Sequence, residues 1–234
     1  MDAESCFIVS DLHLGSAYFH HRNFLAWLDA LPVGAQLVLN GDIIDEPRRP
    51  LPDEHRAVLE RLVCESHKRP VVWVYGNHDA EFELAASGQI QFVDSWEIER
   101  RLLIVHGDRL DKLMPKHRFF KWLFRRFLRR SVVLGSQNVH VAEYAKRWRL
   151  FYRVLNDHVA KNALRAARQQ GFAAVVCGHT HAAMDLEHQG CRYFNTGSWT
   201  EVPLHFLEVA PDCIALRIYE AVSYTHLTLP TNRE

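Results

Sequence analysis

The sequence predicts an α/β layered sandwich, because short apolar runs alternate with helical periodicities along most of its 234 residues. Runs such as 6–9 and 36–39 have the length and β-branched content of buried strands. Residues 21–31 and 52–67 instead repeat their apolar side chains at helical spacing. With 48% hydrophobic residues the chain can bury a large core, so we expect one domain over residues 1–220.

Further strands are predicted over residues 71–75, 91–96, 101–105 and 173–177, and the remainder reads as antiparallel strands. Five of the predicted strands end in side chains that bind metal ions. These are Asp11 and His13, Asp42, Asn77, His106, and the pair His179 and His181. Because ligands of open α/β sheets gather at the carboxyl ends of strands, we expect these side chains to converge.

The chain is organised around residues 71–79, where a β-branched and aromatic run stops at a glycine and presents Asn77, His78 and Asp79 in succession. These three residue types are poor strand formers but good metal ligands and proton carriers. We expect Asn77 to bind a metal, His78 to move a proton and Asp79 to orient His78. For Asp79, capping of a turn is the alternative.

The predicted ligands suffice for two metal ions. One ion would be held by Asp11, His13, His181 and the shared carboxylate Asp42, and the other by Asp42, Asn77, His106 and His179. Imidazole and carboxylate ligands without thiolates favour Mn²⁺, Fe or Zn over Mg²⁺ or Ca²⁺. Two divalent ions ~3.5–4 Å apart can activate a water and neutralise charge on a phosphoryl group.

The ordered motifs resemble the signature of the calcineurin-like metallophosphoesterases. They are Asp11-x-His13, Gly41-Asp42-x-x-Asp45, Gly76-Asn77-His78-Asp79, His106-Gly107-Asp108 and Gly178-His179-Thr180-His181. The resemblance covers residues 10–199. It implies a four-layer αββα sandwich, a dinuclear metal centre and hydrolysis of a phosphoester.

A basic segment separates His106 from His179, and we expect it to form a helical insertion at about residues 110–170. Residues 112–168 hold fifteen Lys and Arg against two acids, although the net charge of the whole chain is zero. Within 116–131, apolar and aromatic side chains occupy one helical face and basic ones the other. This pattern is typical of an interfacial helix on anionic lipid. A helix docked on the core and a surface for nucleic acid are the alternatives.

An insertion with an apolar face and a basic face beside the active site suits a substrate that has acyl chains and phosphates. This architecture is similar to the UDP-2,3-diacylglucosamine pyrophosphatases of lipid A biosynthesis. That resemblance implies two Mn²⁺ ions, peripheral contact with the inner membrane, and release of UMP and 2,3-diacylglucosamine 1-phosphate. The best-known branch of those enzymes has Arg where this chain has His78. A soluble phosphodiester, a dinucleotide or a phosphoprotein is therefore the alternative substrate, and a nucleic-acid-binding module with a vestigial site is the third hypothesis.

The five cysteines contain no Cys-x-x-Cys pair, and no signal peptide precedes the first strand. We therefore expect a cytoplasmic protein without a disulfide framework. Residues 221–234 have no periodicity and resemble a non-native tail, so they are left out of the fold prediction.

Overall fold

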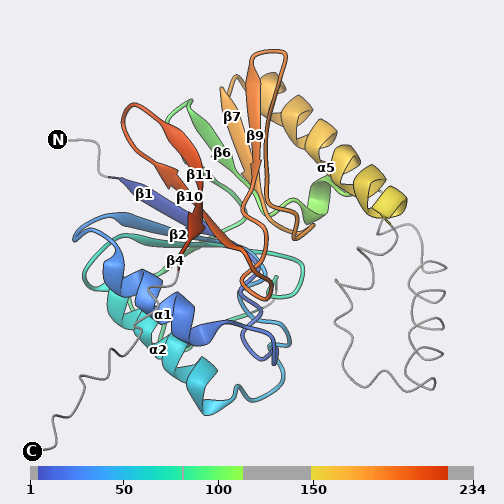
Figure 1. Cartoon of the computed structure of the whole chain (residues 1–234). Helices are drawn as coiled ribbons and strands as arrows, with labels where there is room; N and C mark the ends of the chain where they lie inside the picture. Colours follow the sequence, from blue (N-terminus) through green and yellow to red (C-terminus); the bar gives the residue numbers. More distant parts are fainter. Residues whose placement is uncertain (1–4, 81, 113–148, 221–234) are drawn as a thin grey trace, which may run out of the picture.

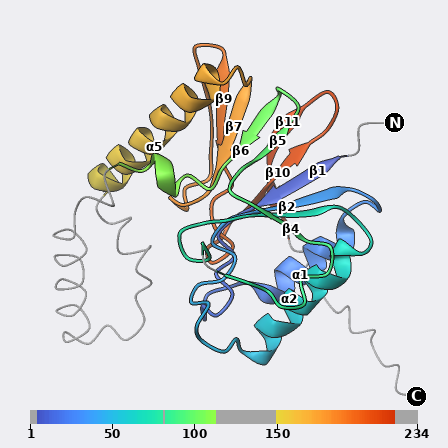
Figure 2. The ribbon, with the colours of Figure 1, turned by 180° about the vertical axis from the view of Figure 1, so that it is seen from behind.

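The computed structural model describes residues 5–80, 82–112 and 149–220. The predicted interfacial helix at 116–131 and the tail at 221–234 lie outside these residues. Two β-sheets face each other, and helices cover their outer faces (Figures 1 and 2).

The first sheet has the strand order β11-β10-β1-β2-β3-β4. Its strands are β1 (Cys6–Val9), β2 (Gln36–Asn40), β3 (Val71–Val74), β4 (Gln91–Val93), β10 (Leu204–Val209) and β11 (Ile214–Tyr219). Strands β1 to β4 are parallel, whereas β10 and β11 form an antiparallel hairpin beside β1. Helices α1 (His21–Ala30) and α2 (Asp53–Ser66) cover its outer face.

The second sheet has the order β5-β6-β7-β9-β8. Its strands are β5 (Trp96–Ile98), β6 (Leu102–Ile104), β7 (Ala174–Cys177), β8 (Met184–His188) and β9 (Cys191–Asn195). Helix α5 (Arg149–Gln169) lies along its outer face, and the short 3₁₀ helix η1 (Asp108–Leu110) follows β6.

Alternating side chains along the inner strands build the layers, because successive strand residues point to opposite faces. In the first sheet, Leu37 and Trp73 pack toward α1 and α2. Their neighbours Val38 and Val72 instead pack against the second sheet, where they meet Val176. The chain therefore folds as a helix–sheet–sheet–helix sandwich, which confirms the predicted fold class.

Two details of the predicted strands are wrong. Residues 91–96 form no single strand: β4 pairs with β3 in the first sheet, and β5 pairs with β6 in the second. The chain crosses between the sheets at the exposed residues Asp94 and Ser95. In addition, β9 runs parallel to β7, while the hairpins β8–β9 and β10–β11 and the pairing of β10 with β1 fit the predicted antiparallel pattern. Apolar content alone does not show which neighbour a strand will pair with.

Candidate metal centre

The predicted ligands follow the carboxyl ends of parallel strands in both sheets. Asp11, Asp42 and Asn77 come after β1, β2 and β3, while His106 follows β6 and the His179–His181 turn follows β7. The carboxyl ends of the two sheets meet at one edge of the sandwich, so all seven side chains lie in one network of close contacts.

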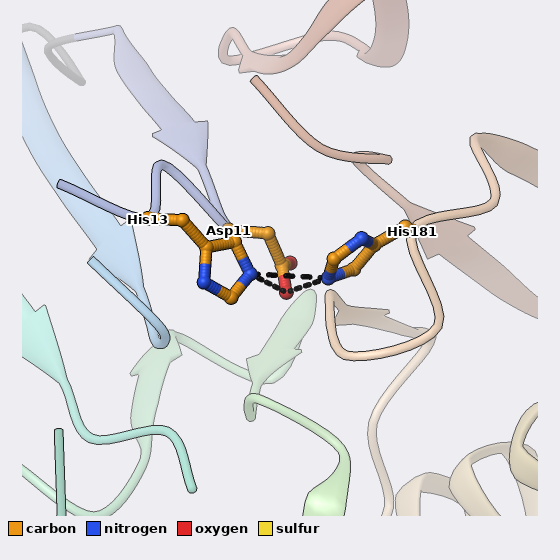
Figure 3. Close-up of side chains that lie close together, drawn as sticks. All are labelled: Asp11, His13 and His181. Atoms are coloured by element: carbon orange, nitrogen blue, oxygen red, sulfur yellow. Dashed lines mark hydrogen bonds and ion pairs between the residues drawn. The ribbon is translucent and has the colours of Figure 1, made fainter. Parts of the chain in front are cut away.

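The first cluster consists of Asp11, His13 and His181 (Figure 3). His181 Nε2 lies 3.1 Å from Asp11 Oδ1 and 3.2 Å from His13 Nε2. All three ligand atoms face the same point, with the Asp11 carboxylate between the two imidazoles. Two imidazole nitrogens and a carboxylate oxygen at this spacing form a set that a divalent transition metal can use.

The second cluster consists of Asp42, His106 and His179. His106 Nε2 lies 3.2 Å from Asp42 Oδ2, and His179 Nδ1 lies 3.0 Å from Asn77 Oδ1. Asn77 therefore stands beside this cluster, as the sequence predicts. The two clusters adjoin, since the backbone N–H of His179 donates to the Asp11 carboxylate. A role for Asp42 as a ligand shared by two ions stays a prediction.

His106 has a side chain prepared to bind a metal. Its Nδ1–H donates to the Asn40 carbonyl oxygen at 3.0 Å, so Nε2 is the ring nitrogen that would bind a metal ion in place of its proton. That Nε2 atom is buried and has no hydrogen-bond partner. A divalent ion between His106 and Asp42 would satisfy both groups, so the residues present fit the metal centre that the motifs imply.

The backbone at the site is strained. Five of the seven predicted ligands have left-handed φ angles, between 52° and 64°: Asp11, His13, Asp42, His179 and His181. Such a conformation costs a non-glycine residue about 1–3 kcal/mol and persists only where its surroundings fix it. Only two other non-glycine residues in the described ranges share it. The concentration of strain on these residues is typical of a functional site.

Two glycines allow the ligand loops to approach one another closely. A Cβ atom on Gly76 would lie 2.3 Å from Asp42 Oδ1, and one on Gly178 would lie 2.2 Å from Asp11 Oδ2. Any side chain at either position would therefore displace a carboxylate of the site.

The buried acids and imidazoles hold each other in their charged forms. Burial raises the pKa of Asp42, but the neighbouring His106 and His78 outweigh it, and the pKa is well below its usual range. At Asp11, His181 likewise outweighs burial and lowers the pKa. Burial lowers the pKa of His106, and the Asp42 carboxylate more than reverses this and raises it to about 10. In the absence of metal, protons therefore supply the positive charge of the site.

His78 is held by Asp45, not by Asp79. Its Nδ1 atom lies 2.8 Å from the carbonyl oxygen and 3.3 Å from Oδ1 of Asp45, which also contacts His13 Nδ1 at 3.1 Å. The hydrogen bond that His78 donates to Asp45 raises the pKa of His78 to about 9. Asp45 was absent from the predicted site residues, although it stands in the Gly41-Asp42-x-x-Asp45 motif that could have revealed it.

Asp79 caps a turn instead of orienting His78. Its carboxylate accepts hydrogen bonds from the Gly76 and Ile43 backbone N–H groups, at 2.7 and 2.8 Å, and from the Trp73 indole at 3.1 Å. Asp79 therefore fixes the loop that carries Asn77, which is the alternative role that the sequence left open.

A further residue, Asp111, was not predicted to lie at the site. Its Oδ2 atom lies 3.1 Å from His179 Nε2, and the Asp111 side chain is buried. No motif marks Asp111, because it follows a 3₁₀ turn and reaches His179 only through the fold.

A family model for calcineurin-like phosphoesterases matches residues 6–183. The chain belongs to the calcineurin-like phosphoesterase family. This membership agrees with the two Asp/His clusters and identifies the protein as a phosphoester hydrolase. A search of curated proteins gives no match for the chain.

The solved structures that match the chain come from several organisms. The phosphoesterase Yfce from E. coli is 19% identical in sequence, with a TM-score of 0.47. The match covers 92% of this chain and 100% of that chain. Wild-type Vps29 from Entamoeba histolytica, complexed with Zn²⁺, is 14% identical, with a TM-score of 0.45 and coverages of 92% and 97%. The nuclease MPE from Pseudomonas putida is 20% identical, with a TM-score of 0.42 and coverages of 86% and 83%.

Proposed function

We propose that this calcineurin-like phosphoesterase hydrolyses UDP-2,3-diacylglucosamine to UMP and 2,3-diacylglucosamine 1-phosphate, with two Mn²⁺ ions, in the cytoplasm at the surface of the inner membrane. The observation that carries this proposal is the set of contacts made by the described residues that flank the basic, aromatic segment at 113–148. Residues on both sides of 113–148 contact the metal-binding turn after β7.

On the near side of the segment, Asp111 contacts His179 at 3.1 Å. On the far side, the Tyr152 hydroxyl of α5 donates to the Thr180 carbonyl oxygen between the two histidines. The described residues that flank 113–148 therefore lie next to the predicted metal ligands His179 and His181. The aromatic and basic side chains of 116–131 offer apolar surface for acyl chains and positive charge for phosphates.

The two clusters and Asn77 would hold the metal ions, which supply water activation and charge neutralisation on the diphosphate. His78 carries a proton at neutral pH, because Asp45 raises its pKa to about 9. Its Nε2 atom lies 3.9 Å from Asp42 Oδ2 and is the atom free to donate, since Nδ1 contacts Asp45. His78 is thus suited to protonate a leaving oxygen or to bind a phosphate oxygen.

In the described part of the chain, no helix combines the length and apolarity that crossing a bilayer requires. The membrane contact that we propose is peripheral and made through residues 116–131, whose sequence is typical of an interfacial helix.

The test is release of UMP from UDP-2,3-diacylglucosamine presented in mixed micelles. We expect turnover that depends on Mn²⁺ and is abolished in Asp42→Ala, because that carboxylate lies in the second cluster. Loss of the apolar side chains of 116–131 should raise KM for the lipid and leave turnover of a water-soluble aryl phosphodiester unchanged. Absence of UMP release alongside good turnover of the soluble ester would exclude the lipid substrate.

A soluble phosphodiester is the second candidate, and His78 favours it. An alkoxide leaving group needs a proton more than a phosphate leaving group does, and His78 can provide one. Sedimentation with anionic vesicles separates the two: an enzyme for a soluble substrate should stay in the supernatant.

A further inference from the structure

The segment Asn195–Trp199 begins at the last residue of β9 and contacts the backbone around both clusters. It is rich in polar residues, yet none of its side chains belongs to either cluster. Asn195 pairs with Cys177 in the parallel register of β9 and β7, so it lies beside the start of the turn that carries His179 and His181.

Asn195 is fully buried, and both the nitrogen and the oxygen of its side-chain amide make hydrogen bonds. Nδ2 donates to the Gly178 carbonyl oxygen at 2.7 Å and to Thr180 Oγ1 at 3.1 Å. Oδ1 accepts the Gly197 backbone N–H at 2.9 Å. Asn195 therefore ties its own turn to the residues that immediately precede His179 and His181.

Those two histidines have left-handed φ angles of 64° and 56°. Residues in such strained conformations relax unless neighbouring contacts fix them. The hydrogen bonds from Asn195 lie in a buried, low-dielectric region, where they are strong and where their loss leaves polar groups unsatisfied. Asn195 is placed to supply this restraint.

Ser198 acts in the same way on the first cluster alone. Its hydroxyl donates to the Asp11 carbonyl oxygen at 3.0 Å, and the Trp199 backbone N–H donates to the same oxygen at 3.1 Å. Asp11 is itself left-handed, with a φ angle of 52°.

We propose that Asn195 and Ser198 are positioning residues that set the metal affinity of the centre: Asn195 for both ions, and Ser198 for the ion held by Asp11, His13 and His181. This inference rests on the two-metal centre of the proposed function but not on its lipid substrate. Outer partners of metal ligands typically change metal affinity by about 10–100-fold.

The test measures Mn²⁺ binding by calorimetry and electron paramagnetic resonance, with no substrate present. In Asn195→Leu, which keeps the volume of the side chain and adds no charge, we expect both dissociation constants to rise about 10–100-fold. In Ser198→Ala only one of the two should rise. Thr180→Val removes a hydroxyl that Asn195 contacts while keeping its shape, and should weaken binding in the same direction even if Asn195→Leu does not fold.

Ser66→Ala is the matched control, because it removes a buried hydroxyl that bonds to Val63 and Gln89 at the far end of α2. It should lower stability and leave both Mn²⁺ affinities within about twofold. Unchanged affinities in the Asn195 and Thr180 variants, or equal weakening in Ser66→Ala, would overturn the proposal. A wild-type chain that binds no Mn²⁺ would instead refute the two-metal centre itself.

Discussion

At the scale of single residues, His78 shows how a neighbouring carboxylate prepares a proton donor. Asp45 contacts one ring nitrogen and raises the pKa of His78 to about 9, so the ring is protonated at neutral pH. The other ring nitrogen, Nε2, lies 3.9 Å from Asp42 Oδ2. A proton held there matters most when the departing oxygen is strongly basic.

We therefore expect His78→Ala to lower kcat by about 10²–10⁴-fold on alkyl phosphodiesters, whose leaving groups need protonation. The loss should be smaller on p-nitrophenyl esters, whose leaving group is stable as an anion. The comparison is kcat for the two ester series, with the exposed His188→Ala on β8 as the control. Equal losses in both series would contradict a role as proton donor.

At the scale of elements, α2 is tied to its surroundings by one buried acid. Glu65 is 1% exposed and bonds to Arg61, Lys68 and Arg69, at 2.9, 3.1 and 2.7 Å. Arg61 also reaches Asp29 in α1, so the network links the two helices that cover the first sheet. Burial raises the pKa of Glu65, but its three cationic partners outweigh this and lower it.

Removing the charge in Glu65→Gln should reduce the free energy of unfolding by about 3 kcal/mol, because it leaves the buried Arg69 without its carboxylate. Urea denaturation measures this. The difference from wild type should shrink as the pH falls below the ordinary carboxyl pKa of 4.5, since stability from a lowered pKa is present above that value and lost below it. Mn²⁺ affinity should not change, because α2 supplies no ligand.

At the scale of the whole molecule, each metal cluster joins the two sheets. Asp11 and Asp42 come from the first sheet, while His106, His179 and His181 come from the second. A bound ion would therefore stabilise the contact between the sheets, by about 2.7 kcal/mol for each site at a hundred times its dissociation constant. Without metal, protonated imidazoles of the second sheet pair with carboxylates of the first sheet and provide part of this stabilisation.

The metal-free protein should accordingly lose stability as the pH rises. His106 has a folded pKa of about 10, above its ordinary 6.5, so its contribution is complete below pH 6.5 and falls as the pH approaches 10. The slope is about 1.4 kcal/mol per pH unit for each such histidine. Thermal unfolding in EDTA should show a Tm that decreases over this range. With excess Mn²⁺ the Tm should stay constant or rise, because the ions bind the deprotonated rings, and a parallel decrease in both conditions would refute this account.

The fold class and the gathering of the predicted ligand residues at one edge of the sandwich were predictable, because both follow from where the apolar runs of the sequence end. Each strand ends where its apolar run ends, and the polar residues after it must lie at the edge of the sheet. The partners of these residues were not predictable in the same way. Asp111 reaches His179 from a separate turn, and the choice between Asp45 and Asp79 as the partner of His78 depends on loop geometry. The crossing between sheets at Asp94 also depends on pairing across the fold.

The left-handed backbone at Asp11, His13, Asp42, His179 and His181 also bears on how this protein can change over time. Glycine adopts that conformation without strain, so replacing one of these residues by glycine removes a local cost at the same time as it removes a ligand. Loss of activity is then compatible with a sound fold, and selection for stability alone would erode the site. The backbone conformation by itself does not favour aspartate or histidine at these five positions.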